Sequence, residues 1–248
     1  MYRIVILSAF LLLSLTGMGQ VTSADNVQLL YRNEFTGAFT VHSNGISITA
    51  RRTFHPDALK KRGFEVELTN LKHPKEVKTF HPFFENSRGY VFGKLNNFSS
   101  LRLGYGQEPV IAEQTDKGSI EIRYLYYGGL SLGLVKPVYL EILYPTESPG
   151  SYYSIIERYD PDKHRVENIY GRASFTEGLG EMSFLPGAYA KLGFNFLYSI
   201  EADQVLMAEL GMAFDYFPTD VPIMAIENNK QFFTTYYISL HYGLKWNK

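Results

Sequence analysis

The stretch FFTTYYISLHYGLKW, residues 232–246, decides the fold because two kinds of side chain alternate along it. Its even positions are apolar or aromatic except for Thr234, and its odd positions are mixed and mostly polar, including Ser239, His241 and Lys245. Successive side chains of a β-strand point to opposite faces. A period of two over this length therefore predicts one long strand with a single apolar face.

The same period of two recurs along most of the chain, whereas a helical period is hard to find. Apolar or aromatic side chains take the even positions of 188–198, 206–216 and 120–134, with Gly128 as a gap. Together the patterns predict eight strands, at residues 33–43, 46–55, 62–71, 97–106, 118–134, 185–200, 203–217 and 230–247.

Glycines mark two places where the chain turns or bends. At Asn44-Gly45 the apolar positions change from odd to even, as a type I′ turn between antiparallel strands requires. At Gly128-Gly129 the parity is unchanged. We therefore predict one long strand with a glycine bend there, and not a hairpin. A tight connection is expected around 201–203.

Composition excludes several classes of protein. The 248 residues carry 24 Lys and Arg against 25 Asp and Glu, and 15% of them are aromatic. This aromatic content and low charge exclude a disordered chain, and a net charge of −1 gives no electrostatic basis for binding nucleic acid. The chain has no cysteine, which excludes a disulfide framework and a cysteine-based zinc site.

The first residues have the pattern of a secretory leader. Met1, Tyr2 and Arg3 precede a mostly apolar run at 4–15, and small residues follow at 17–19. The run is too short to cross a bilayer, so residues 1–19 are predicted to be a cleaved signal peptide, with a retained anchor as the alternative. Residues 20–248 then form a single domain.

Alternation alone fits both a soluble β-protein, whose apolar face points inward, and a membrane barrel, whose apolar face points outward to lipid. The polar face of the last three strands has twenty positions, of which only Lys191, Glu209, Asp215 and Lys245 are charged. A water-facing sheet would carry more charge, and the apolar face has aromatic residues toward its ends, as membrane barrels do. The sequence predicts an all-β, eight-stranded antiparallel up-and-down transmembrane β-barrel in the cell outer membrane. A soluble periplasmic β-protein is the alternative.

The predicted interior contains five charges of each sign. Eight strands enclose a space that side chains can fill, so we expect a plugged barrel and not a pore. Because an unpaired buried charge is costly, these residues should form salt bridges, with a proton or ion path as the alternative. They are Arg51, Arg102, Arg123, Lys191, Lys245, Glu65, Glu67, Glu121, Glu209 and Asp215.

The longest predicted loop, 135–184, should be ordered. With both chain ends periplasmic, it lies outside the cell with the connections 44–45, 72–96 and 218–229. It has apolar residues to bury, including Tyr152, Ile155 and Ile169. We therefore expect a structured cap or a partner-binding surface.

Few residues have the pattern of a chemical site. In the long loop, Asp160, Asp162, His164 and Glu167 form a weak candidate metal cluster, although Asp-Pro-Asp also initiates turns and His164 with Glu167 could share one face of a short helix.

For a lipid-modifying barrel enzyme, the candidates are His241 beside Ser239 and His42 beside Ser43, neither with an evident acid partner. The basic stretch Arg51, Arg52, Lys60, Lys61 and Arg62 could contact lipid phosphates or an acidic partner. We predict no catalytic, cofactor-binding or metal residues and no enzymatic activity.

Several stretches resemble a widespread family of exported outer-membrane β-barrel proteins of Bacteroidota, mostly uncharacterised. The resemblance covers most of the mature chain. It implies compartment and fold, and by analogy an accessory subunit of the barrel-assembly complex or of the type IX secretion apparatus, with outer-membrane lipids and other outer-membrane proteins or surface lipoproteins as partners. The stretches are His42–Gly45, Lys72–Glu76, Phe92–Phe98, Tyr127–Gly133, Lys136–Leu140, Ile169–Arg172 and Pro186-Gly187.

Overall fold

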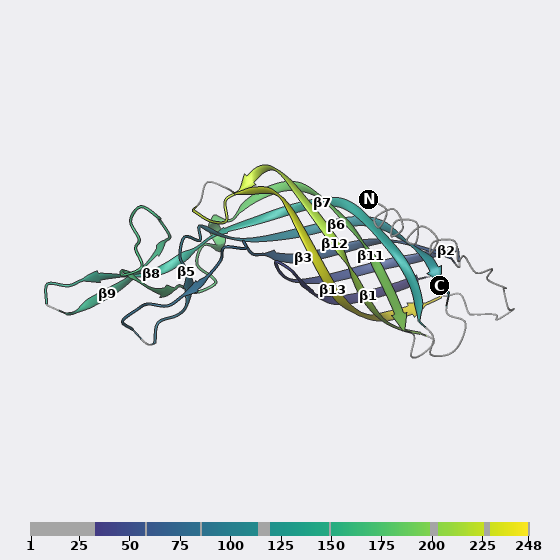
Figure 1. Ribbon diagram of the computed structural model, residues 1–248, viewed down its shortest axis with the longest axis horizontal. Coiled ribbons are helices and arrows are strands. Elements are labelled where there is room, and N and C mark those ends of the chain that lie inside the picture. Colours follow the sequence, from purple (N-terminus) through teal and green to yellow (C-terminus); the bar gives the residue numbers. More distant parts are fainter. Residues whose placement is uncertain are drawn as a thin grey trace, which may run out of the picture.

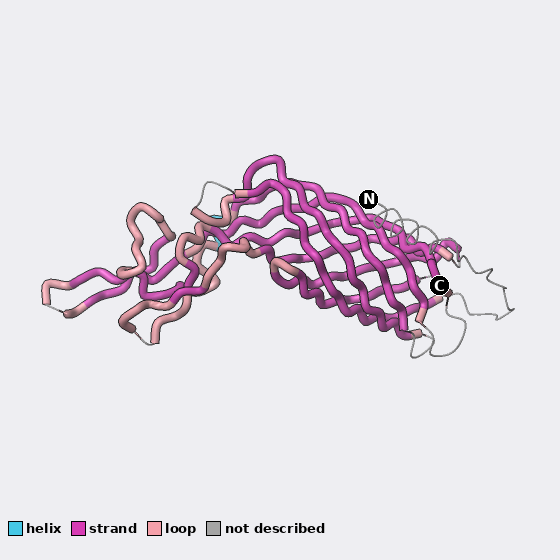
Figure 2. Tube along the Cα trace, viewed as in Figure 1, coloured by secondary structure: helices cyan, strands magenta, loops and turns pink. Residues whose placement is uncertain are grey.

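The computed structural model describes residues 33–57, 59–84, 86–113, 120–148, 150–198, 203–225 and 229–247. Within them, eight strands close into an antiparallel barrel in the order β1-β13-β12-β11-β7-β6-β3-β2 (Figures 1 and 2). The strands are β1 (Asn33–His42), β2 (Gly45–Asp57), β3 (Lys60–Leu71), β6 (Asn96–Ala112), β7 (Glu121–Pro137), β11 (Ser183–Tyr198), β12 (Gln204–Val221) and β13 (Lys230–Trp246). The predicted leader at 1–19 and residues 199–202 lie outside the described residues.

Two connections between barrel strands fold into a cap at one end of the barrel. The connection from β3 to β6 contains β4 (Lys78–Thr79) paired with β5 (Tyr90–Val91). The connection from β7 to β11 contains β8 (Tyr139–Pro145), β9 (Tyr152–Arg158), β10 (Ile169–Arg172) and the short 3-10 helix η1 (Leu179–Glu181). Figure 1 shows β5, β8 and β9 projecting beyond the barrel. The predicted ordered loop is therefore confirmed. Among the described residues, no helix has the length and hydropathy of a membrane span.

The strand predictions are confirmed in number and order, with local corrections. β7 runs unbroken through Gly128-Gly129, as the unchanged parity indicated. The first hairpin turns at Ser43-Asn44 and not at Asn44-Gly45, because His42 pairs with Gly45. Neither turn residue has a positive φ, so the predicted type I′ turn is wrong.

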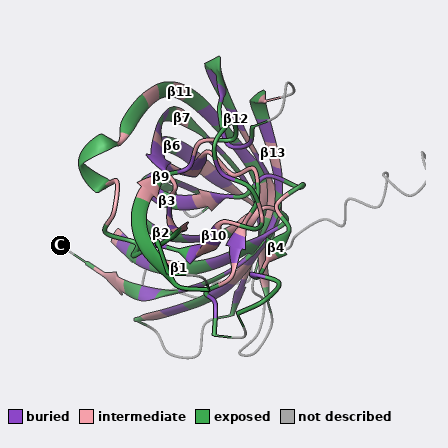
Figure 3. Cartoon of the chain, turned by 90° about the vertical axis from the view of Figure 1, so that its left-hand side faces the viewer, coloured by how far each residue is buried: buried purple, intermediate pink, exposed green. Residues whose placement is uncertain are grey.

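The outward face of the barrel is apolar. Leu130, Ile238 and Leu240 expose 70%, 66% and 64% of their surface. Figure 3 shows exposed and buried residues alternating along the strands. A water-soluble protein rarely exposes a continuous apolar patch of this kind, whereas a lipid bilayer covers one without cost. The chain is a transmembrane barrel of the outer-membrane type, and the soluble alternative is wrong.

Aromatic residues flank this apolar belt toward both ends of the barrel. Tyr216 and Phe232 are register partners toward the cap end, and both are exposed. Tyr198 and Tyr242 are both register partners of Leu206, so they share a level toward the opposite end. Tyrosine and phenylalanine at these two levels form the aromatic girdles typical of membrane barrels.

The interior is filled in layers. At the cap end, Phe98, Phe217 and Phe233 contact one another at centroid separations of 5.3 to 6.2 Å, and they belong to an apolar cluster with Leu71 and Met224. At the opposite end, Leu197, Val205 and Met207 form a smaller apolar group. Charged residues occupy the space between. The prediction of a plugged barrel is confirmed.

The charged layer is a connected salt-bridge network. Arg51 contacts the carboxylates of Glu65, Glu108 and Glu209, the last at 2.7 Å, and its guanidinium lies 4.7 Å from the ring centroid of Tyr127. A second centre is Arg102, which binds Glu67 and Asp215, and Lys191 joins the two centres through Glu65 at 2.7 Å and Glu67 at 2.5 Å.

All ten predicted charges occupy inward-facing positions, and nine of them form salt bridges; Lys245 has no carboxylate within 4.0 Å among the described residues. Three further inward charges were not predicted: Glu108, Glu34 and Lys61. Lys61 Nζ lies 2.8 Å from Glu34 Oε2. Buried charge at this density requires partners, and removing one partner of a buried pair is strongly destabilising.

Candidate functional site

The first candidate catalytic pair is His241 with Ser239, both on β13, and their side chains contact different neighbouring strands. His241 Nε2 lies 3.2 Å from Glu209 Oε2 of β12. Ser239 Oγ accepts a hydrogen bond from Thr40 Oγ1 at 2.8 Å and donates to the carbonyl of Phe39, both on β1. The structure thus supplies an acid partner, Glu209, that the sequence did not reveal for His241. The hydrogen bonds of Ser239 go to β1 and not to His241.

The second candidate pair is also separated. His42 Nε2 lies 2.9 Å from Thr69 Oγ1 inside the barrel. Ser43 is exposed, and its hydroxyl donates to Asn44 Oδ1 at 3.1 Å within the turn.

His241 exposes only 2% of its surface and lines no part of the cavity described below.

The candidate metal cluster of the long loop forms a turn. Asp160 accepts the backbone N–H of Asp162 at 3.0 Å, and this hydrogen bond holds the pKa of its carboxyl below the ordinary value. His164 Nδ1 accepts the Asp160 N–H at 3.0 Å, and its Nε2 lies 3.3 Å from Glu157 Oε2. Glu167 contributes its carbonyl, 3.1 Å from His81 Nε2. No three potential ligands gather at a metal-binding distance in the described ranges, and residues 161–168 form turns and not the short helix that was the alternative for His164 and Glu167.

The basic stretch divides according to strand parity. Arg51 and Lys61 point inward and are 1% exposed, whereas Arg52, Lys60 and Arg62 point outward. Arg51 and Lys61 therefore cannot contact lipid phosphates or an acidic partner. The outward residues lie near the end of the barrel opposite the cap, where long cationic side chains can reach lipid headgroups.

An apolar core holds the cap together. Tyr90 of β5 packs with Leu140 and Ile142 of β8, Tyr159 and Ile169, each no more than 5% exposed. Backbone hydrogen bonds join the connections to one another: Val138 N donates to Leu95 O at 2.9 Å between the two long connections, and Ala225 N of the β12–β13 connection donates to Gly93 O at 2.7 Å. The two long connections therefore form one structure.

Strand β9 is the open edge of the cap sheet. The sheet order is β10-β8-β9, so β9 has β8 as its only sheet neighbour in the described chain. Four of its seven side chains are aromatic or apolar, and these lie on both faces and are exposed: Tyr152 55%, Tyr153 49%, Ile155 42% and Ile156 46%. Such an edge presents unpaired backbone groups to any strand that approaches.

The outward amides of β9 follow from its register. Tyr159 N donates to Val138 O, so the backbone of Tyr159 faces β8, and Leu143, the register partner of Ser154, donates its N–H away from β9 to Asn168 O. Because hydrogen-bonded and non-bonded pairs alternate in an antiparallel ladder, the backbone groups of alternate residues point away from β8. These residues are Tyr152, Ser154, Ile156 and Arg158.

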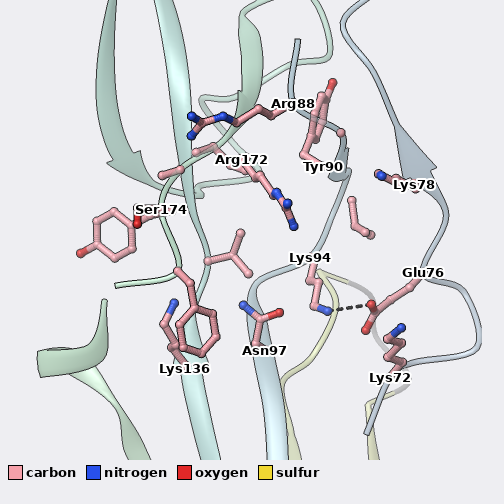
Figure 4. Close-up of a pocket in the computed structure, with 17 residues that line it drawn as sticks. Lys72, Glu76, Lys78, Arg88, Tyr90, Lys94, Asn97, Lys136, Arg172 and Ser174 are labelled. Atoms are coloured by element: carbon pink, nitrogen blue, oxygen red, sulfur yellow. Dashed lines mark hydrogen bonds and ion pairs between the residues drawn. The ribbon is translucent and has the colours of Figure 1, made fainter. Parts of the chain in front are cut away.

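A cavity of about 620 Å³ opens where the cap meets the barrel. Figure 4 shows Arg172 extending toward its middle, with Lys136 and Asn97 along its barrel side. We call it the cationic cleft; its charged lining residues are Lys72, Glu76, Lys78, Arg88, Lys94, Lys136 and Arg172. They come from the β3–β6 connection, the end of β7 and the end of β10. Sequence reasoning missed this site because each residue looks like an ordinary surface charge on its own segment.

The chain matches no protein-family description and no curated protein. Among solved structures, similarity is found to the N-terminal β-barrel domain of Pseudomonas aeruginosa OprF, to Neisserial surface protein A and to Ail, the attachment invasion locus protein of Yersinia pestis. Identity is 8% in each case, with TM-scores of 0.35, 0.38 and 0.35. The matches cover 87%, 87% and 88% of this chain and 98%, 97% and 100% of theirs. The assignment to the membrane rests on burial and strand register, described above.

Proposed function

We propose that this barrel is a non-enzymatic scaffold or accessory subunit that docks another outer-membrane protein or a surface lipoprotein through strand β9. The exposed apolar edge of β9 carries the proposal. The barrel anchors the chain among outer-membrane lipids, and the cap holds the docking strand away from them.

The contrast between sheet edges supports docking by strand addition. The barrel is closed, so its strands leave no free edge. The cap keeps a seven-residue edge strand with apolar side chains on both faces. An edge left in this state is an aggregation hazard unless a partner covers it, and an added strand gains main-chain hydrogen bonds and side-chain contacts together.

The larger assembly that we propose is a multi-subunit outer-membrane machine of Bacteroidota, either the barrel-assembly complex or the type IX secretion apparatus. The sequence resemblance supports this choice.

The experiment removes one outward amide from β9. Ser154→Pro deletes a backbone N–H that points away from β8, and proline is tolerated at the edge of a sheet. Ser154→Ala is the matched control because it keeps the amide. We expect Ser154→Pro to lose its stoichiometric outer-membrane partners on purification in mild detergent, and Ser154→Ala to retain them. Equal partner recovery from both variants, with the heat-modifiable band unchanged, would refute docking through β9.

A lipid-modifying enzyme remains the second candidate because His241 contacts Glu209 inside the barrel. His241→Gln keeps a hydrogen-bonding side chain and removes the imidazole. On the scaffold proposal, lipid extracted from cells carrying this variant has the same acylation profile as lipid from cells with the native chain. A changed profile, with barrel abundance unaltered, would favour the enzyme.

A further inference from the structure

The cationic cleft is strongly unbalanced in charge. Six cationic side chains line it, against the single carboxylate of Glu76. The cations are Lys72, Lys78, Arg88, Lys94, Lys136 and Arg172. This site is separate from the docking edge of β9, and the inference drawn from it does not depend on the proposed scaffold role.

Most of these cations lack an acidic partner. Lys94 Nζ lies 2.6 Å from Glu76 Oε2, and Arg88 Nη1 lies 3.6 Å from Glu141 Oε1. No carboxylate in the described part of the chain lies within 4.0 Å of the other four cations. Most cations of the barrel interior differ: Arg51, Lys61, Arg102, Arg123 and Lys191 each have such a partner, and only Lys245 has none among the described residues.

Lys136 shows that the imbalance extends below the surface. This residue is only 7% exposed, and its Nζ lies 5.0 Å from the centroid of the Phe175 ring. A largely buried ammonium normally has a carboxylate beside it. Glu177 of the same cap acts on Lys136 electrostatically from beyond 4.0 Å, so an anion from outside the chain can take the place of a direct partner in the cleft.

The cap core fixes the backbone positions around the cleft. Tyr90 and Leu140 line the cleft and also belong to the apolar core of the cap, where they are 3% and 1% exposed. Arg172 ends β10, which is paired with β8. The folded cap therefore presents these cations around one cleft, and an anion bound there lowers the repulsion among their like charges.

The size of the cleft indicates the class of anion. A cavity of about 620 Å³ lies in the range occupied by small organic ligands and greatly exceeds the needs of one phosphate group. Its lining also includes Tyr139, Val138 and Phe175, which offer apolar surface. We propose that the cationic cleft binds a saccharide bearing two or more phosphates, taken either from the headgroup of an outer-leaflet glycolipid or from a soluble molecule.

The test uses the full-length protein in an uncharged detergent and isothermal titration calorimetry. The probes are a bisphosphorylated disaccharide without acyl chains, the same disaccharide without phosphates, and inorganic phosphate. We expect the bisphosphorylated disaccharide to bind at least tenfold more tightly than either other probe. Binding should also weaken as ionic strength rises from about 0.01 M to about 0.15 M, because the Debye length falls from about 30 Å to about 8 Å.

Variants of the chain link binding to the cleft. Arg172→Ala removes an exposed guanidinium from the cleft, and Lys136→Gln removes the buried charge while keeping most of the side-chain volume. Each should weaken binding of the bisphosphorylated disaccharide roughly tenfold or more. Arg165→Ala, on an exposed arginine of the same cap outside the cleft, is the matched control and should change nothing. Heat-modifiable mobility in gels checks that each variant is folded.

A final arm separates the two sources. The same phosphorylated headgroup with acyl chains is placed beside the protein in phosphatidylcholine nanodiscs, and retained lipid is counted by native mass spectrometry. Retention that Arg172→Ala abolishes assigns the ligand to the membrane, and binding of the soluble disaccharide alone assigns it to solution. The proposal is overturned if inorganic phosphate binds as tightly as the bisphosphorylated disaccharide, or if Arg172→Ala behaves like Arg165→Ala.

Discussion

In the barrel each strand has a neighbour on both sides, whereas in the described part of the cap β9 pairs with β8 alone. The charged residues differ in the same way. Arg51 inside the barrel contacts three carboxylates, while Arg172 in the cap has none within 4.0 Å among the described residues. The barrel thus closes its backbone ladder and pairs its central charges within itself, as a membrane span must, and the cap leaves groups available to other molecules.

The largest expected effect tests how much the buried salt-bridge network stabilises the barrel. Arg51→Ala leaves Glu65, Glu108 and Glu209 buried without their common partner, which should cost about 3 to 5 kcal/mol. Equilibrium urea unfolding in detergent micelles, followed by tryptophan fluorescence and gel mobility, measures the loss. Arg62→Ala is the control, since Arg62 lies on the neighbouring strand β3 and points outward. A loss no greater than that of Arg62→Ala would show that the network is not what stabilises the barrel.

A smaller effect tests how closely the barrel strands pack. A Cβ at Gly129 would lie 2.0 Å from the carbonyl oxygen of Leu103, whereas one at Gly128 would meet nothing nearer than 3.8 Å. Gly129→Ala should therefore destabilise the barrel by about 1 to 3 kcal/mol through overpacking. Gly128→Ala should be nearly neutral. The same unfolding measurement applies, and similar values for the two variants would contradict the packing argument.

The smallest effect lies in the cap and depends on pH. The pKa of Asp160 is lowered in the folded cap by the N–H of Asp162, so the carboxylate stabilises the turn above the ordinary pKa of aspartate. This contribution is lost as the pH falls through the lowered pKa. Asp160→Asn keeps an acceptor for the N–H but cannot ionise.

Hydrogen exchange of the segment 159–168, compared between the native chain and Asp160→Asn at each pH from about 7 to about 3, measures this contribution. The protection of the native chain should fall toward that of the variant at the acid end. Barrel amides serve as the internal control and should show no difference between the two chains. A constant difference in protection across the range would contradict the role assigned to the carboxylate.

Strand parity allowed most of the barrel to be predicted. The period of two assigned the ten inward charges because parity holds along a continuous strand. Glu108 was missed because the strand was predicted to stop at 106, and Lys61 because its strand was predicted to begin at 62. Both strands continue past those limits, to Ala112 and from Lys60. These two errors arose at strand ends, where few alternating positions remain to reveal the pattern. Glu34 was not predicted, although it has the inward parity of the predicted strand 33–43.

The sequence by itself determined which residues face lipid and which face the interior, because parity is a local property of an extended chain. Only the tertiary structure decided which charges pair, as with His241 and Glu209 from different strands. It also decided that Lys72, Lys136 and Arg172 meet in one cleft. Contacts between distant segments depend on how loops pack and strands close, and no local period in the sequence records them.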